Sequence, residues 1–141
     1  MSEELKKARA ILEDGGYTCV LLSGDTVYTD TKRGVAPLVS FLDSGDDFTG
    51  FSAADKVVGN GAAYLYVLLG VKELYAKTVS ESAADTLKKH GIPLYFDTLV
   101  PAIRNRAGDG ICPIELAVTD SKDPSDALIR IRERLRSLSK Q

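Results

Sequence analysis

The chain has 141 residues, of which 44% are hydrophobic and 27% are charged, and its formal net charge is −2. This length and composition predict one globular domain, residues 1–141, with an apolar core. The slight acidity excludes the broad basic field that would favour nucleic acid or anionic lipid as a partner.

The order of the predicted elements favours an α/β fold. Apolar spacing and turn residues define the elements. In chain order they are a helix over 5–12, strands over 17–23 and 26–30, helices over 35–43 and 52–69, a strand over 71–78, a helix over 80–91, a strand over 92–97, and helices over 112–119 and 123–138. A strand, a helix and a strand in succession favour a right-handed crossover in a partly parallel sheet.

The targeting signals expected of exported or membrane proteins are missing from the sequence. The N-terminus has no apolar stretch typical of a signal peptide, and no segment approaches 18 consecutive apolar residues. We therefore expect a cytoplasmic protein without a membrane segment.

The predicted helix over 52–69 is apolar almost all round, which is typical of a central, closely packed helix. Ser52 and Asp55 have the spacing of a capping box, so Asp55 either caps this helix or acts in catalysis. Lys56 falls in the first turn, where a cation opposes the helix dipole by a few tenths to about 1 kcal/mol. This position predicts a nearby carboxylate or a bound anion, and an ordinary surface lysine is the alternative.

The two cysteines have different expected roles. Cys19 lies in a buried strand and is interpreted as part of the core. Cys112 directly precedes Pro113 at the start of a short helix, shortly after Arg104 and Arg106. A helix N-terminus and nearby cations lower the pKa of a thiol, so Cys112 is either a nucleophile or a buried thiol.

A second candidate site lies at the start of the helix over 80–91. Ser80 or Ser82 can cap this helix, and Glu81 complements its dipole. His90 is the only histidine and falls at the C-terminal end of the same helix, where a capping role is expected. With one histidine at a helix end, the sequence does not favour a Ser-His-Asp triad and lacks the residues for a two-histidine zinc site.

Five stretches taken together resemble the prokaryotic domain-of-unknown-function family numbered 1893, whose fold is similar to that of cytidine deaminases. They are RGVAPL (33–38), DKVVG (55–59), GVKELYA (70–76), VPAIRNR (100–106) and CPIE (112–115). The resemblance implies a three-layer α/β fold, with a mixed β-sheet and helices on both faces. It implies no known activity.

The same resemblance indicates where a pocket lies and excludes zinc-dependent deamination there. Zinc deaminases carry histidine-x-glutamate at one helix start and proline-cysteine-x-x-cysteine at the next. Here those places read SAADKVV and TVSESAA, without histidine or cysteine. We therefore expect no metal, no cofactor and no zinc-dependent deamination. By analogy, Asp55 and Lys56 would share one pocket with Ser80 and Glu81.

Our leading hypothesis is metal-independent binding of a small anionic or nucleotide-like molecule in this pocket, with thiol-dependent turnover as an extension. The candidate catalytic residues are Cys112, Lys56 and Asp55. The candidate ligand-binding residues are Arg33, Ser80, Glu81, Arg104, Asn105 and Arg106. Two alternatives stay open: an inactive regulatory or protein-interaction module, including a homodimer, and RNA binding through the basic C-terminal helix.

Overall fold

A computed structural model describes residues 1–139, so the last two residues of the predicted domain lie outside the described part. Five strands form one sheet: β1 (Cys19–Ser23), β2 (Thr26–Asp30), β3 (Ser52–Val58), β4 (Glu73–Ser80) and β5 (Leu94–Val100). Their order is β2-β1-β3-β4-β5. β1 is antiparallel to both of its neighbours, whereas β3, β4 and β5 are mutually parallel.

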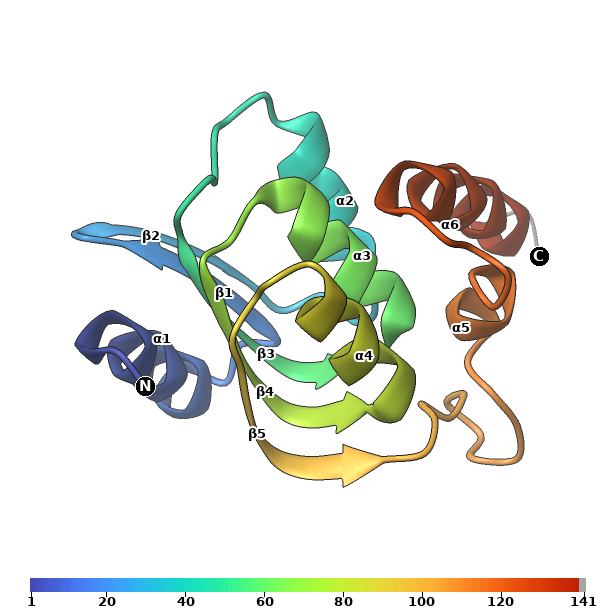
Figure 1. Cartoon of the computed structure of the whole chain (residues 1–141), viewed down its shortest axis with the longest axis horizontal. Coiled ribbons are helices and arrows are strands. Elements are labelled where there is room, and N and C mark those ends of the chain that lie inside the picture. The colour runs from blue at the N-terminus through green and yellow to red at the C-terminus, as the bar shows by residue number, and fades with distance from the viewer. Residues whose placement is uncertain (140–141) are drawn as a thin grey trace.

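Helices cover both faces of this sheet (Figure 1). They are α1 (Glu3–Gly15), α2 (Ala36–Asp43), α3 (Asn60–Leu69), α4 (Glu81–Lys89), α5 (Pro113–Ala117) and α6 (Pro124–Ser139). α1 lies on one face, and α3 and α4 lie on the other with α2, α5 and α6 packed around them. The predicted three-layer α/β fold with a mixed sheet is confirmed. Within residues 1–139, none of the helices combines the length and apolar character needed to cross a membrane.

The α1 face of the sheet has a small apolar core. Leu5, Ala8 and Leu12 recur at helical spacing and are fully or almost fully buried. Alternate residues of β1, β3 and β4 point at them, because successive strand side chains face opposite sides of a sheet. These strand residues are Val20, Leu22, Ala54 and Tyr75.

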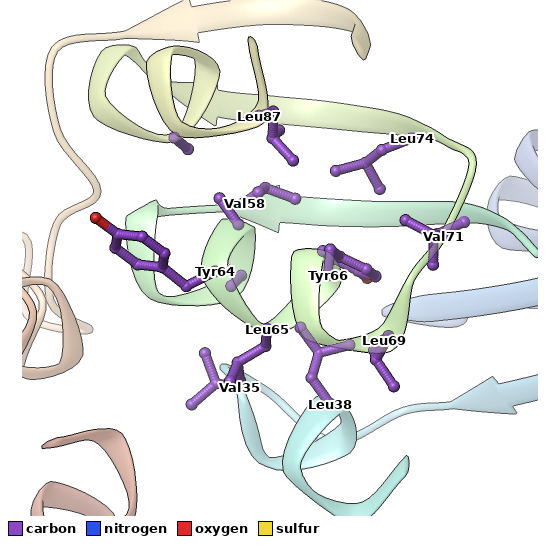
Figure 2. Close-up of a cluster of buried hydrophobic side chains, with 14 of the residues drawn as sticks. Val35, Leu38, Val58, Tyr64, Leu65, Tyr66, Leu69, Val71, Leu74 and Leu87 are labelled. Atoms are coloured by element: carbon purple, nitrogen blue, oxygen red, sulfur yellow. The ribbon is translucent and has the colours of Figure 1, made fainter. Parts of the chain in front are cut away.

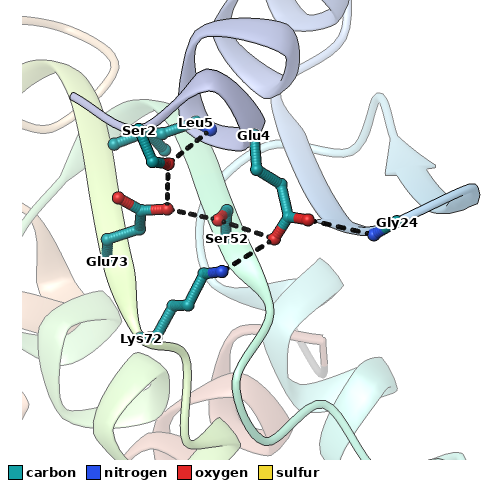
Figure 3. A network of polar contacts seen from close by, with 7 residues as sticks. All are labelled: Ser2, Glu4, Leu5, Gly24, Ser52, Lys72 and Glu73. Carbon is teal, nitrogen blue, oxygen red and sulfur yellow. Dashed lines mark hydrogen bonds and ion pairs between the residues drawn. The ribbon is translucent and has the colours of Figure 1, made fainter.

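Ser2 and Glu73 join the start of α1 to the sheet (Figure 3). Ser2 is the N-cap residue of α1, and its Oγ accepts a hydrogen bond of 3.0 Å from the backbone N–H of Leu5. The same hydroxyl donates to Glu73 Oε2 on β4. Ser52 Oγ on β3 lies 2.6 Å from that carboxylate oxygen. One serine therefore both caps the helix and ties it to β4.

Glu4 supplies a second tie between α1 and the rest of the fold (Figure 3). Its carboxylate accepts a 3.0 Å hydrogen bond from the backbone N–H of Gly24 and lies 3.1 Å from Lys72 Nζ. The Gly24 hydrogen bond, together with Lys72 and Ser52, holds the pKa of Glu4 below its usual value. The start of α1 is thus fixed by paired polar groups.

The opposite face carries the larger core, centred on α3 (Figure 2). α3 is buried on nearly every side because the sheet, α2, α4 and α6 all contact it. This explains its almost uniformly apolar sequence. The labelled core residues of Figure 2 are Val35, Leu38, Val58, Tyr64, Leu65, Tyr66, Leu69, Val71, Leu74 and Leu87.

The prediction of one helix over 52–69 is wrong in its first half. Residues 52–58 form β3, and α3 begins at Asn60. β3 is buried over residues 52–55 and at Val58, whereas Lys56 and Val57 are exposed, so its burial does not alternate and periodicity alone does not separate it from a buried helix. Val57 and Val58 favour a strand, and the extended Gly59 (φ −93°, ψ −179°) separates it from the helix.

This correction removes two local interpretations. Ser52 and Asp55 are strand residues and form no capping box. Lys56 is likewise in a strand, so no helix dipole opposes its charge. The start and end of α4 are confirmed: Ser80 Oγ accepts a 3.2 Å hydrogen bond from the N–H of Ala83, and His90 is the C-cap residue.

Candidate functional site

Two lysines lie side by side on the α1 face of the sheet. The register pairs Asp55 with Ala76 and Val57 with Thr78, so Lys56 of β3 stands opposite Lys77 of β4. A cavity of about 170 Å³ adjoins them. We call it the Lys56–Lys77 pocket, and its lining consists of Leu12, Glu13, Lys56, Tyr75 and Lys77. Both lysine side chains are exposed, and their like charges repel each other across the two parallel strands.

The carboxylates around the Lys56–Lys77 pocket already have partners. Glu13 Oε1 lies 3.2 Å from Arg9 Nε. Asp97 Oδ2 accepts a 2.8 Å hydrogen bond from the Tyr75 hydroxyl, and Asp97 Oδ1 lies 3.6 Å from an Arg9 terminal nitrogen. Among residues 1–139, no acidic side chain forms an ion pair with Lys56 or Lys77.

Tyr75 lines this pocket, and Arg9 packs against its ring. The Arg9 guanidinium carbon lies 4.7 Å from the centre of the Tyr75 ring, within the range of a cation–π contact. Burial, together with the hydrogen bond to Asp97, raises the pKa of Tyr75 to about 12, so its hydroxyl remains a donor at neutral pH. The hydrogen bond to Glu13 raises the pKa of Arg9 further above its usual value. The two lysines therefore remain the groups without an internal anion.

Asp55 lies on the other face of β3 from Lys56 and belongs to a closed, buried chain of hydrogen bonds. Its Oδ2 accepts from the Tyr66 hydroxyl at 2.6 Å, and that hydroxyl lies 3.3 Å from Cys19 Sγ. Val57 N–H donates to Oδ1 at 3.2 Å. Burial raises the pKa of Asp55 to about 7, and it raises the pKa values of Tyr66 and Cys19 as well. Asp55 and Lys56 are neighbours in the sequence, but Asp55 lies in the buried core and Lys56 lines the pocket on the other face.

The N-terminus of α3 is occupied by a side chain of α5. Asn60 N–H donates to Glu115 Oε1 at 2.6 Å, and Gly61 N–H donates to Glu115 Oε2 at 2.9 Å. A Cβ atom on Gly59 would overlap this carboxylate. Glu115 thus fills the place at which helix amides would bind an external anion. The two glycines on either side of Asn60 are the only local sign of this close approach in the sequence around Asn60.

Cys112 precedes α5 and is half-buried. It packs against the core on the α3 side of the sheet, and its N–H donates to Ile103 O at 3.0 Å. Within the described residues its thiol makes no capping hydrogen bond to α5, which has only five residues. Cys112 is therefore separated from Lys56 by the sheet, and the structure does not bring these two candidate residues together.

The candidate residues before Cys112 lie in a surface loop. Asn105 Nδ2 donates to Asp109 Oδ1 at 2.9 Å, and Asp109 N–H donates back to Asn105 Oδ1 at 3.2 Å. Asn105 thus shapes this turn. Arg104 and Arg106 are exposed, and neither forms an ion pair within residues 1–139.

Three further candidates lie elsewhere. Ser80 is fully buried as the N-cap of α4, and Glu81 is exposed in the first turn of that helix. Arg33 is exposed in the connection from β2 to α2. None of these three residues lines the Lys56–Lys77 pocket. Across residues 1–139, no group of three or more histidine, cysteine or acidic side chains is placed to hold a metal ion.

Comparison with known proteins defines the chain first as an α/β domain of unknown function. The family model described as "Domain of unknown function (DUF1893)" matches residues 7–135. The chain therefore belongs to the DUF1893 family, as the sequence resemblance implied. It is similar to the crystal structure of a DUF1893 family protein, TM1506, from Thermotoga maritima. That match has 25% identity and a TM-score of 0.86, and it covers 97% of this chain and 91% of the other.

Deaminases are also among the similar solved structures. A dCMP deaminase from the cyanophage S-TIM5 has 15% identity and a TM-score of 0.48, covering 68% of this chain and 99% of the other. A diaminohydroxyphosphoribosylaminopyrimidine deaminase/5-amino-6-(5-phosphoribosylamino)uracil reductase from Thermotoga maritima has 14% identity and a TM-score of 0.41, covering 82% and 40%. No curated protein matches the sequence.

Proposed function

We propose that the protein binds a small anion with phosphate or carboxylate chemistry in the Lys56–Lys77 pocket. The observation that carries this proposal is the pair of adjacent lysines on β3 and β4. They have no acidic partner within residues 1–139, because the nearby carboxylates of Glu13 and Asp97 are paired with Arg9 and Tyr75. An anion between the two ammonium groups would replace their repulsion by charge-assisted hydrogen bonds.

The size of the pocket limits the ligand. A water molecule takes about 30 Å³ of liquid volume, so a cavity of about 170 Å³ accommodates a phosphate or a short carboxylate. A whole nucleotide exceeds this volume. A nucleotide-like ligand would place its phosphate between the lysines and its remaining atoms outside the pocket.

A titration with inorganic phosphate tests the proposal. Calorimetry should detect binding to the unmodified protein, and binding should weaken as salt rises because the ion pairs are partly exposed. The double variant K56Q/K77Q should bind at least tenfold more weakly. It should unfold at an equal or higher denaturant concentration in the absence of phosphate, since the repulsion is removed.

Lys88→Gln is the matched control, because Lys88 is an exposed lysine of α4 outside the pocket. It should bind phosphate as the unmodified protein does. Equal phosphate binding by K56Q/K77Q and the unmodified protein would contradict the proposal.

The proposal uses neither Cys112 nor the exposed arginines. Thiol-dependent turnover at Cys112 and ligand binding by Arg33, Ser80, Glu81, Arg104, Asn105 and Arg106 stay predictions from the sequence. The interaction-module and RNA-binding alternatives also stay predictions. In α3, Gly61 packs against Ile114 of the same chain, so this part of the helix is not free for a homodimer interface.

A further inference from the structure

A second cavity lies on the α3 face of the sheet, between α3, α4 and the connection from α5 to α6. Its volume is about 330 Å³, and we call it the Ser121 pocket. It is lined by Tyr64, Thr86, Lys89, His90, Ser121 and Lys122. It shares no residue with the Lys56–Lys77 pocket. Its volume lies within the range of about 300–1,000 Å³ that small-molecule sites occupy.

Ser121 has an unpaired hydroxyl at this pocket. The residue is 7% exposed, and its Oγ is buried without a hydrogen-bond partner among the described residues. Its backbone is held on both sides: the carbonyl accepts a 2.8 Å hydrogen bond from the Tyr64 hydroxyl, and the N–H donates to Val118 O at 3.0 Å. An unsatisfied buried polar group costs about 1–3 kcal/mol. The hydroxyl therefore needs a partner that the fold does not supply.

The charged groups lining the Ser121 pocket are all basic. Lys89 and His90 come from the end of α4, and Lys122 comes from the α5–α6 connection. None of the three forms an ion pair within residues 1–139. The dipole of α4 favours cations at its C-terminus, which accounts for Lys89 but not for Lys122. Asp120 and Asp123 flank Ser121 and Lys122 in the sequence, but neither lines the pocket, and Asp123 accepts a 2.8 Å hydrogen bond from the N–H of Asp126.

We propose that the Ser121 pocket binds the phosphate group of a small phosphate monoester. A ring N–H of His90 donates to the phosphate oxygens, and the ammonium groups of Lys89 and Lys122 balance the charge. The Ser121 hydroxyl, whose Oγ is buried in the unliganded protein, rotates into the pocket on binding and donates as well. A phosphate monoester suits the pocket because several donors converge on it and its volume leaves room for a small organic group. This site is independent of the proposed function, since it lies in a different cavity of larger volume.

Ribose 5-phosphate, inorganic phosphate and ribose serve as probes in calorimetric titrations of the full chain. The titrations use the K56Q/K77Q background, which removes the other proposed phosphate site, and in it K89Q/K122Q should weaken the binding of ribose 5-phosphate at least tenfold. Ser121→Ala should weaken binding several-fold, but its melting temperature without ligand should be unchanged or higher because an unsatisfied hydroxyl has been removed. Lys88→Gln, which alters an exposed lysine of α4 outside the pocket, should change neither quantity.

Four outcomes would overturn this proposal. The first two are no binding of ribose 5-phosphate and undiminished binding by K89Q/K122Q. The third is a lower melting temperature of ligand-free Ser121→Ala, which would show that a trapped water already satisfies the hydroxyl. Ribose binding as tightly as ribose 5-phosphate would also overturn it. K56Q/K77Q should keep ribose 5-phosphate binding at the Ser121 pocket, so failure at one pocket is distinguishable from failure at the other.

Discussion

The two faces of the sheet hold acidic groups in different surroundings: Glu4 is partly exposed, and Asp55 is buried. On the α1 face, Glu4 accepts a backbone hydrogen bond and lies next to Lys72 at the edge of a small apolar cluster. On the α3 face, Asp55 is enclosed in the larger core and has only neutral donors, chiefly the Tyr66 hydroxyl. The pKa of Glu4 is lowered, whereas that of Asp55 is raised.

This difference shows which physical effect dominates at each place. A cation and a backbone donor stabilise the charged form of Glu4. Around Asp55, removal from water disfavours the charged form more than its hydrogen bonds favour it. On the α1 face, the hydrogen bonds and the ion pair of Glu4 therefore involve its ionised carboxylate. The α3 face is stabilised chiefly by apolar packing.

The largest expected effect comes from disrupting that packing. Leu65 of α3 is completely buried, so Leu65→Ala should lower the free energy of unfolding by about 2–5 kcal/mol. Urea denaturation measures the change. Leu116→Ala is the control, because Leu116 is 61% exposed and its truncation should stay within about 0.5 kcal/mol of zero. Similar costs for both variants would contradict the central position of α3 in the core.

A pH titration should give the next largest effect. The unfolded-state pKa of Asp55 is near 3.8 and its folded-state pKa is about 7. Between these values the folded chain keeps a proton that the unfolded chain releases. The stability contributed by protonated Asp55 is thus fully present below about pH 4 and declines as the pH rises to about 7. The loss should be on the order of a few kcal/mol.

Asp55→Asn separates this effect from other titrations. The amide keeps an acceptor for Tyr66 but carries no charge, so the decline in stability between pH 5 and pH 7 should disappear. Glu4→Gln should retain that decline. The contribution of Glu4 has the opposite sign: its folded-state pKa is lowered, so its stability is present above its usual pKa of 4.5 and is lost on acidification. A flat pH profile of the unmodified protein would refute the assignment.

The smallest expected effect is on the α1 face. Ser2→Ala removes the N-cap of α1 and its hydrogen bond to Glu73, which should cost about 1 kcal/mol of stability. Ser40→Ala is the control, because Ser40 is an exposed residue within α2. Chemical denaturation compares the two variants. If Ser2→Ala lowered the free energy of unfolding by more than Leu65→Ala does, the α1 face would contribute more to stability than expected, and the predicted order of the two effects would be wrong.

Local patterns predicted much of the fold, but they failed where a strand is buried on both faces. The spacing of Leu5, Ala8 and Leu12 identified α1, and Ser80 identified the start of α4. Residues 52–58 were assigned to a helix because a buried parallel strand lacks the alternation that marks an exposed one.

The candidate site was less predictable because it depends on pairing between distant segments. Lys56 was singled out because it was expected in the first turn of a helix, which is wrong, and the place of Lys77 beside it depends on the register between β3 and β4. Ser121 gave no signal, since a serine in a polar connection is ordinary until its burial is known. Contacts between side chains of distant segments leave no repeating residue pattern that a single sequence could show.

Glu115 also affects the order in which the chain can complete its structure during synthesis. The amides of Asn60 and Gly61 find their acceptor more than fifty residues downstream. By the time β5 has been made, all five strands exist, but the first turn of α3 still lacks its carboxylate. The central helix is therefore completed only after the residues of α5 have emerged. A chain ending before residue 113 would contain the whole sheet and leave its central helix uncapped.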